Sequence, residues 1–486
     1  MPSKLDLAVG ADVVGLNARV LFDYANVHFD QENEVVAMLS LTAPTVDVSL
    51  KRPPLNIVAA IDCSTSMSGP KMVNAKASLR RLVDHLGPDD RLAIIGFHST
   101  VFEVLPSTLM DGAAKPAAQK KIDGLRPAGW TNFSGALLQA FAEIQKVEGK
   151  KGCVNRIILF TDGEPTQGVT DPGAILNMLD KAMIPEISVS TFGYGTDHDT
   201  ELLSEMAKRG KGNFFFVDDI DKCASMFGTE LGGLLTTYAQ NVKVTYTFAD
   251  GVSLVKVLDP SLEVSGNTIT MPDILGEESK HILLKLKLPK KSRAVTARPS
   301  RVVDFAIEYD SVVEAKHRSF SEDAHINYVR RKEEVSDTVN SEVQAQLDLV
   351  NAANVLENVK VLADAGNLEA ARGILRGYRT ELGERSHVYA MNLTEELGRM
   401  EVNLSTSDGY HATRGDLIGS THSLRSRRAG GSARSAVMFS TSAQASTAAS
   451  FSADPDDAGL NAAVLEGVVP TSSTSDAPAP PPSRSK

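Results

Sequence analysis

The chain is poor in cysteine and tryptophan, and it contains no long apolar run. Only three of its 486 residues are cysteines, namely Cys63, Cys153 and Cys223, and they lie far apart. Three scattered thiols favour neither a disulfide framework nor a thiolate zinc site, and they are typical of a reducing compartment. No apolar run approaches the roughly 18 residues of a membrane helix, so we expect no membrane span.

The amino terminus and the charge exclude further classes of protein. The first residues, MPSKLDLAVGADVVG, lack the continuous apolar stretch of a secretory signal, so we expect a cytoplasmic location. The formal net charge is −11, whereas nucleic-acid binding needs a basic surface that displaces counterions from phosphates. We therefore expect a protein partner and no nucleic acid. No pattern in the sequence indicates the oligomeric state.

One long segment in the first half of the chain alternates strands with helices. Between residues 53 and 240, short β-rich runs such as LNIVAAI and RIILFT are separated by amphipathic stretches, which predicts an α/β unit with a doubly wound, mostly parallel sheet. Residues 1–52 and 241–330 show the alternating pattern of half-buried strands. We predict that these two flanks form one β-sandwich interrupted by the α/β unit. The alternative is a separate sheet in each flank.

The last part of the sequence changes character twice. Residues 331–404 have a helical pattern, with Gly366 at an expected C-cap and Asn367 at an expected N-cap, and they predict a helical hairpin. Residues 405–486 are rich in Ser, Ala, Thr, Gly and finally Pro, so we expect a disordered tail. A basic cluster within this tail could dock an acidic patch; it consists of Arg425, Arg427, Arg428 and Arg434.

Polar residues follow two predicted strands of the α/β unit and precede one of its helices. They are Asp62, Ser64 and Ser66 in the first loop, Thr131 in the second and Asp162 in the third. Ligands of a doubly wound sheet lie beyond the carboxyl ends of its strands, where the strand order reverses. Oxygen donors alone suit a hard cation, so we predict a Mg²⁺ site, with Mn²⁺ or Ca²⁺ as alternatives. The simpler alternative is that these residues only cap helices and close turns.

These five residues, together with FGYGTDHDTELLSEMAKRGKGNFFFVDD downstream, resemble the von Willebrand factor type A (vWA) domain and its metal-ion-dependent adhesion site. The resemblance covers about residues 53–240. It implies that Ser64 and Ser66 bind the ion directly and that the two aspartates bind it directly or through water. It further implies that Thr131 binds the ion in one conformation of the loops and not in another. It also implies that the ion accepts an Asp or Glu of a protein partner. Thr65 stands where family members often carry glycine.

Three further residues are candidates for a partner-binding rim around the ion, namely His98, Trp130 and His198. The two histidines could equally be solvated loop residues, and Trp130 could pack beneath its loop instead of facing a partner. A catalytic hypothesis would make Ser64 or Ser66 a nucleophile with a histidine as base. Neither a G-x-S-x-G elbow nor a phosphate-binding P-loop occurs, so we expect no enzyme.

The order of parts also looks like plant RING-type ubiquitin ligases that carry a vWA domain, but the closely spaced Cys and His ligands of a RING do not occur. The sequence therefore predicts a binding or scaffolding protein that captures an acidic residue of a partner through the metal site. The alternative is a structural or assembly protein. In that case the β-sandwich makes the main contacts, and the metal site is vestigial or purely stabilising.

Overall fold

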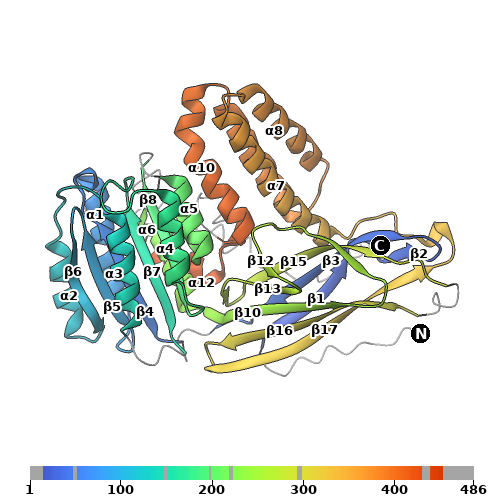
Figure 1. The fold of residues 1–486 in the computed structure, drawn as a ribbon, viewed down its shortest axis with the longest axis horizontal. Helices are drawn as coiled ribbons and strands as arrows, with labels where there is room; N and C mark the ends of the chain where they lie inside the picture. The colour runs from blue at the N-terminus through green and yellow to red at the C-terminus, as the bar shows by residue number, and fades with distance from the viewer. Residues whose placement is uncertain are drawn as a thin grey trace, which may run out of the picture.

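The computed structural model describes residues 15–46, 52–146, 152–195, 199–217, 223–292, 298–428 and 438–451. It contains three parts, which Figure 1 shows side by side. An α/β unit lies at one end, an elongated pair of β-sheets lies at the other, and a group of helices stands over the boundary between them.

A six-stranded sheet forms the centre of the α/β unit, in the order β6-β5-β4-β7-β8-β9. All neighbouring strands are parallel except the edge strand β6, which is antiparallel to β5. Every residue of β4, β7 and β8 is buried, as expected for apolar strands covered on both faces. The bounds are β4 (Leu55–Asp62), β5 (Arg91–Phe97), β6 (Val101–Leu109), β7 (Val154–Thr161), β8 (Ile187–Tyr194) and β9 (Lys211–Val217).

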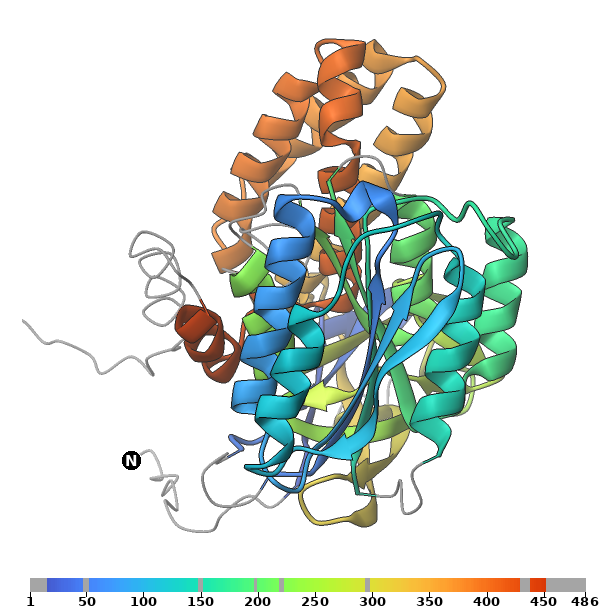
Figure 2. The ribbon, with the colours of Figure 1, turned by 90° about the vertical axis from the view of Figure 1, so that its left-hand side faces the viewer.

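Helices cover both faces of this sheet (Figure 2). Leu79 of α1 and Phe227 of α6 belong to the core on one face. Phe133 of α3, Ile175 of α4 and Leu203 of α5 belong to the core on the other. The predicted doubly wound α/β fold is therefore confirmed. The bounds are α1 (Pro70–His85), α2 (Ala114–Asp123), α3 (Phe133–Gln145), α4 (Pro172–Ala182), α5 (Thr200–Arg209) and α6 (Cys223–Leu235).

The strands before and after the α/β unit form two sheets together. One sheet has the order β1-β3-β15-β11 and the other has the order β12-β13-β10-β16-β17-β2, with β14 paired to β10. The β3–β15 pairing joins residues 33–42 to residues 279–288 across the whole insertion. One apolar core includes Leu39, Ile282 and Phe305 from both sheets. The prediction of a single β-sandwich that contains the α/β unit is therefore confirmed.

The sandwich strands have these bounds: β1 (Asn17–Phe22), β2 (Asn26–His28), β3 (Asn33–Thr42), β10 (Thr237–Phe248), β11 (Ser253–Val257), β12 (Glu263–Ser265), β13 (Thr268–Thr270), β14 (Ile274–Leu275), β15 (Ser279–Leu288), β16 (Ser300–Ser311) and β17 (Lys316–Val329).

The helical region is larger than the predicted hairpin. The hairpin itself is confirmed: Gly366 follows α7 with a φ of +79°, and the Asn367 side chain accepts a hydrogen bond from the backbone of Ala370 at the start of α8. Two more helices continue the bundle, however. The bounds are α7 (Ser341–Asp364), α8 (Leu368–Gly383), α9 (Val388–Asn403) and α10 (Ser407–Ser426).

The prediction that disorder begins at residue 405 is wrong for α10. Tyr410, Leu417 and Leu424 recur every seven residues, so they fall on one face of the helix and join the apolar core of the bundle. The Thr406 side chain caps the helix by accepting a hydrogen bond from the backbone N–H of Gly409. Most residues between these three are polar or small, so the helical pattern was too sparse to be recognised in the sequence.

The same prediction is wrong for α12 (Ser442–Phe451), which packs against α6. A Cβ atom added at Gly228 or Gly232 of α6 would lie 2.7 Å from the backbone of α12, so only glycine allows this close approach. Ala445 and Ala448 of α12 are buried. The contact between α6 and α12 therefore requires small residues, although in α12 these residues resemble a low-complexity sequence. The rest of the predicted disordered tail, residues 429–437 and 452–486, lies outside the described residues.

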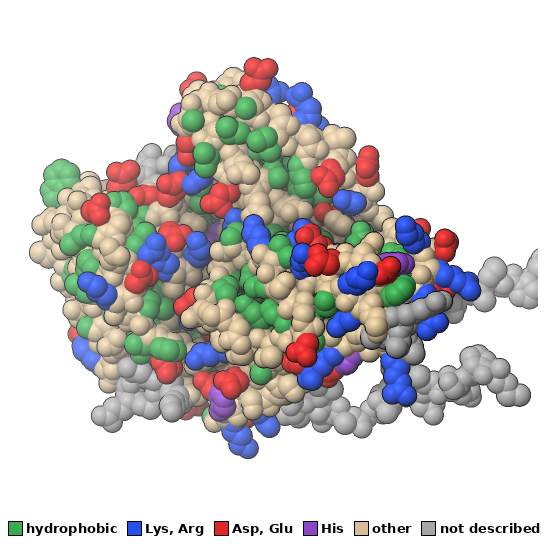
Figure 3. All heavy atoms as spheres, turned by 45° about the vertical axis from the view of Figure 1, so that its right-hand side comes forward, with side chains coloured by type: hydrophobic (Ala, Val, Ile, Leu, Met, Phe, Trp, Pro, Cys, Tyr) green, Lys and Arg blue, Asp and Glu red, His purple; other side chains and the backbone are tan. Residues whose placement is uncertain are grey.

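Two expectations about the exterior can be compared with the structure. Among the described helices, none is long and apolar enough to cross a bilayer. On the face of the molecule that Figure 3 shows, acidic and basic side chains are interspersed over the sandwich and the helical region. A surface of mixed charge offers no continuous basic track to a nucleic acid on that face.

Candidate metal centre

The strand order of the α/β unit reverses between β4 and β7. From β4 the chain continues to β5 on one side, whereas β7, β8 and β9 follow on the other side. Because β4 and β7 are parallel neighbours, their carboxyl ends lie at the same edge of the sheet. Asp62 is the last residue of β4, and Asp162 directly follows β7. The topology therefore brings the two predicted carboxylates together.

Asp62 is fully buried and is held by two hydrogen bonds. Its Oδ1 accepts from the backbone N–H of Ser64 at 2.7 Å, and its Oδ2 accepts from the Thr161 hydroxyl at 2.6 Å. Burial is the main cause that raises the pKa of Asp62 to about 6, the charge of Asp162 adds to it, and the hydrogen bonds oppose it. A buried carboxylate of this kind would gain from a cation beside it.

The two serines connect the first loop to the second carboxylate. The hydroxyl oxygens of Ser64 and Ser66 are 2.9 Å apart, and the Ser66 hydroxyl donates to Oδ1 of Asp162 at 2.8 Å. The other oxygen of Asp162 accepts from the ammonium group of Lys71 at 2.6 Å. Both serine hydroxyls therefore lie within a short chain of contacts that ends at a buried aspartate.

Thr131 reaches the same place from the second loop. Its backbone oxygen accepts from the N–H groups of Thr166 and Gln167, each at 3.1 Å, and its own N–H donates to the Thr166 hydroxyl at 2.9 Å. A Cβ atom added at Gly163 would lie 3.6 Å from the hydroxyl oxygens of both Ser66 and Thr131. The structure therefore gathers all five predicted ligands at one edge.

The departure at Thr65 from the pattern of the family does not disturb the loop. Thr65 begins a short 3-10 helix, Thr65–Met67, which does not require glycine. Its backbone N–H and its hydroxyl both donate to the carbonyl of Gly129 at 3.1 Å. The Ala128 N–H donates in turn to the carbonyl of Cys63 at 2.7 Å. These bonds fix the first loop against the loop that carries Thr131.

Two of the three predicted rim residues lie beside these loops. Trp130 is 67% exposed, so its side chain faces solvent and is not packed beneath the loop. Its backbone N–H donates to the Ser99 hydroxyl at 3.0 Å. His98 is half-buried, and its Nδ1 accepts from the backbone N–H of Thr100 at 3.1 Å. His198 lies outside the described residues.

Sequence reasoning missed three residues that shape this edge. Thr161 and Thr166 donate and accept the hydrogen bonds that hold Asp62 and Thr131, and Lys71 neutralises part of Asp162. Thr161 directly precedes Asp162, so its position at the end of a strand could have indicated a role. Lys71 lies at the start of α1, where cations are unfavourable next to a helix N-terminus, which is also a signal.

The donor set suits a hard cation. Among the described residues, no group of three or more His, Cys, Asp or Glu side chains could hold a metal ion, so an ion at this edge would need the hydroxyl groups. Two carboxylates and three hydroxyls offer oxygen alone, which is the preference of Mg²⁺ and Ca²⁺. Soft metals would prefer thiolates or imidazoles. The residues present therefore fit a magnesium-type ion.

A family model described as von Willebrand factor type A domain matches residues 56–229. YfbK, an uncharacterised protein of Escherichia coli strain K12, is 32% identical over 198 residues, which cover 40% of this chain and 34% of YfbK. The human inter-alpha-trypsin inhibitor heavy chain H4 is 33% identical over 159 residues, which cover 32% of this chain and 17% of that protein. The matches thus span about a third or less of these two relatives.

Solved structures resemble a larger part of the chain. A von Willebrand factor type A protein from Catenulispora acidiphila has a TM-score of 0.62 at 17% identity, covering 80% of this chain and 88% of its own. The ArnB paralog VWA2 from Sulfolobus acidocaldarius has a TM-score of 0.57 at 16% identity, covering 84% and 98%. At these identities the likeness shows the fold alone. This chain therefore contains a von Willebrand factor type A domain at residues 56–229.

Proposed function

We propose that this protein is a non-catalytic binding or scaffolding protein whose vWA domain holds a divalent ion, Mg²⁺ or else Mn²⁺ or Ca²⁺, for capture of an acidic residue of a protein partner. The observation that carries this proposal is the chain of contacts from Ser64 through Ser66 to Asp162, next to the buried carboxylate of Asp62. Family membership of residues 56–229 supports a role in protein–protein interaction.

The five residues would provide two kinds of oxygen ligand. Asp62 and Asp162 would supply negative charge, while Ser64, Ser66 and Thr131 would supply neutral oxygen ligands. With one oxygen from each, these five residues would fill at most five of the six positions around Mg²⁺, so an exchangeable position would remain for a carboxylate of the partner. The bound ion would supply the positive charge that a carboxylate recognises. Trp130, which is exposed beside Thr131, would add an apolar contact.

Lys71 favours a second candidate function. Its ammonium group already pairs with Asp162, so a closed site without a metal is partly neutralised. That arrangement would suit the alternative in which the vWA edge is only a stabilising element and the β-sandwich makes the main contacts of an assembly protein. The Lys71 side chain is 23% exposed, however, so it has room to withdraw when an ion binds.

The contacts of the serines support a non-catalytic role. The Ser66 hydroxyl donates to the carboxylate of Asp162, and the Ser64 hydroxyl is hydrogen-bonded to the Ser66 hydroxyl. Nδ1 of His98 accepts a backbone N–H, so this nitrogen is not paired with a serine. A nucleophilic serine needs a base within hydrogen-bond reach. We extend the proposal to a cytoplasmic location, which the three free cysteines support.

A pull-down from native lysate with the purified full chain tests the proposal. We expect a partner that is retained in magnesium and lost in excess chelator, and lost equally with Asp62→Ala once circular dichroism has shown that this variant is folded. Trp130→Ala should weaken capture without changing magnesium binding by calorimetry. A partner retained equally with chelator and with Asp62→Ala would remove the metal from the mechanism and favour the assembly alternative.

A further inference from the structure

A cavity of about 760 Å³ lies where the vWA domain, the sandwich and the helical region meet. Leu202 and Lys208 of α5 line it on one side, Asp259 and Met271 of the sandwich line it on another, and His422 of α10 lines a third. None of the five predicted metal ligands takes part. A volume of this size is typical of small-molecule sites, which also favour the boundaries between domains.

Three residues at the end of α10 that line this cavity each carry a polar atom without a hydrogen-bond partner among the described residues. Nη1 of Arg425, Nη2 of Arg427 and Nε2 of His422 are all buried and have no hydrogen-bond partner within the part of the chain that the structure describes. A buried polar atom without a partner destabilises a fold, and native structures hold few of them. All three belong to residues that line the cavity, so a ligand that moves these side chains slightly would give them the partners that they lack.

The backbone at Arg427 holds its guanidinium in place. Arg427 has a φ of +53°, in the left-handed region that disfavours residues other than glycine. Its side chain is only 6% exposed, and its Nε donates to the Gln346 side chain at 3.1 Å. Arg427 is the C-cap of α10, where a left-handed residue commonly ends a helix, so the helix end and Gln346 together fix its side chain.

The nearby carboxylate does not satisfy these donors. Nη1 of Arg425 and Nη1 of Arg427 lie 3.7 and 3.9 Å from the oxygens of Asp259, which is too far for hydrogen bonds. Oδ1 of Asp259 instead accepts from the backbone and hydroxyl of Ser261, at 2.9 and 2.6 Å. Nη1 of Arg427 donates instead to the backbone oxygens of Leu424 and Arg425, so the donors left for another acceptor are Nη1 of Arg425 and Nη2 of Arg427.

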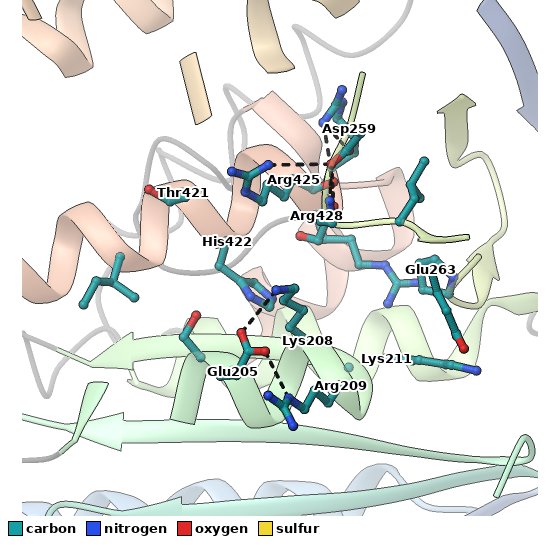
Figure 4. Close-up of a pocket in the computed structure, with 18 of the residues that line it drawn as sticks. Glu205, Lys208, Arg209, Lys211, Asp259, Glu263, Thr421, His422, Arg425 and Arg428 are labelled. Atoms are coloured by element: carbon teal, nitrogen blue, oxygen red, sulfur yellow. Dashed lines mark hydrogen bonds and ion pairs between the residues drawn. The ribbon is translucent and has the colours of Figure 1, made fainter. Parts of the chain in front are cut away.

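His422 adds a different kind of contact. Burial lowers the pKa of His422 to about 4, with the charge of Arg428 as the next cause, so the ring is neutral at pH 7. The imidazole also hydrogen-bonds the backbone of Gly212, which leaves Nε2 as an acceptor for a hydroxyl group. Figure 4 shows His422 extending from α10 toward Lys208 and Glu205 of α5, while Arg425 faces Asp259.

We propose that this cavity binds a small organic phosphate that also carries hydroxyl groups. The phosphate would accept hydrogen bonds from Arg425 and Arg427, and a ligand hydroxyl would donate to His422. A tetrahedral phosphate accepts from several directions at once, which suits donors that come from two separate side chains. Leu202, Leu262 and Met271 would contact the apolar part of the ligand. The proposal does not depend on the metal edge.

Calorimetry of the full chain with inorganic phosphate, AMP and glucose 6-phosphate tests this proposal, with adenosine as the uncharged control and citrate as the carboxylate control. We expect saturable binding of at least one organic phosphate and none of adenosine. Arg427→Met should weaken that binding at least tenfold, because it removes a charged hydrogen bond. Ser204→Phe, which places a ring in the cavity from α5 and keeps Arg425, Arg427 and His422, should weaken it similarly.

The matched control is Arg376→Met, which also lies in the helical region. Arg376 pairs with Glu401, and neither residue lines the cavity, so its loss should leave ligand binding unchanged. If Arg427→Met fails to fold, Ser204→Phe decides the outcome. The proposal is overturned if no phosphate compound binds at millimolar concentration, if citrate alone binds, or if binding survives Ser204→Phe unchanged.

Discussion

The ion pair between Lys71 and Asp162 predicts that Lys71→Met increases the affinity for magnesium. The Lys71 ammonium lies 2.6 Å from Oδ2 of Asp162, whose side chain is fully buried. An ion that uses this carboxylate must compete with the ammonium group. Removing the lysine therefore removes a competitor that is already in place.

The expected size follows from that contact. A hydrogen bond to a charged group contributes about 1.5–3 kcal/mol, and the 23% exposure of Lys71 places this pair toward the lower end. We therefore expect an affinity about tenfold higher in the variant. The metal-free variant should in turn lose roughly 1–2 kcal/mol of unfolding free energy, because Asp162 loses its only cation pair among the described residues.

The fluorescence of Trp130 offers a direct assay. It is the only tryptophan in the chain, it is exposed, and it precedes the predicted ligand Thr131. A magnesium titration of wild type and Lys71→Met would give both dissociation constants. Lys76→Met is the matched control on the same helix, since the Lys76 ammonium binds only the backbone oxygens of Asp123 and Leu125 in the described structure. An equal or weaker affinity in Lys71→Met would refute the reasoning.

Three further predictions concern stability. Thr161→Val removes the hydroxyl that donates to Asp62, so the free energy of unfolding in urea should fall by about 1–3 kcal/mol; an unchanged value would contradict the role of that bond. Gly232→Leu should detach α12, because even a Cβ would lie 2.7 Å from Cα of Gln444, and limited proteolysis should then cut the carboxyl-terminal region faster than in wild type; equal rates would contradict this. Burial lowers the pKa of Lys280 to about 8. The unfolded chain therefore binds more protons at this lysine between pH 8 and about 10.5, so its contribution to folding stability should rise with pH there, by up to about 3 kcal/mol. Lys280→Met should remove that rise, measured as the difference between the two proteins; parallel pH profiles would contradict the prediction.

Local patterns were sufficient to predict most of the fold. The apolar runs of β4 and β7 indicate strands that are buried on both faces, and the alternation of β16 indicates a strand that is buried on one face. The pairing of the flanks could be inferred only from their similarity in pattern. The register, such as Leu39 opposite Ile282, depends on contacts between residues far apart in the sequence.

The carboxyl-terminal helices show where composition misleads. In α10, Leu417 and Leu424 are separated mostly by small and polar residues, and the helix packs against α7 and α5, so it is stabilised by tertiary contacts more than by its own periodicity. The arginines at its end looked like an exposed basic cluster. Arg427 and Arg428 are instead buried between the three parts of the molecule, which no local pattern could reveal.

The candidate site was easier to locate than to describe. Asp62 and Asp162 could be placed at one edge because parallel strands end together, and the loop residues followed from the resemblance. The pairing of Lys71 with Asp162 could not be predicted, because it depends on how α1 leaves the first loop. The position of Trp130 was open in the sequence and is exposed in the structure.

Magnesium binding itself tests the central claim most directly. Isothermal titration of the full chain with Mg²⁺ should show one saturable site in wild type and none in Asp62→Asn, which keeps the shape of the buried side chain but loses its charge. Circular dichroism would verify that both proteins are folded. No binding to wild type, or equal binding to Asp62→Asn, would contradict the account of a metal centre at the ends of β4 and β7.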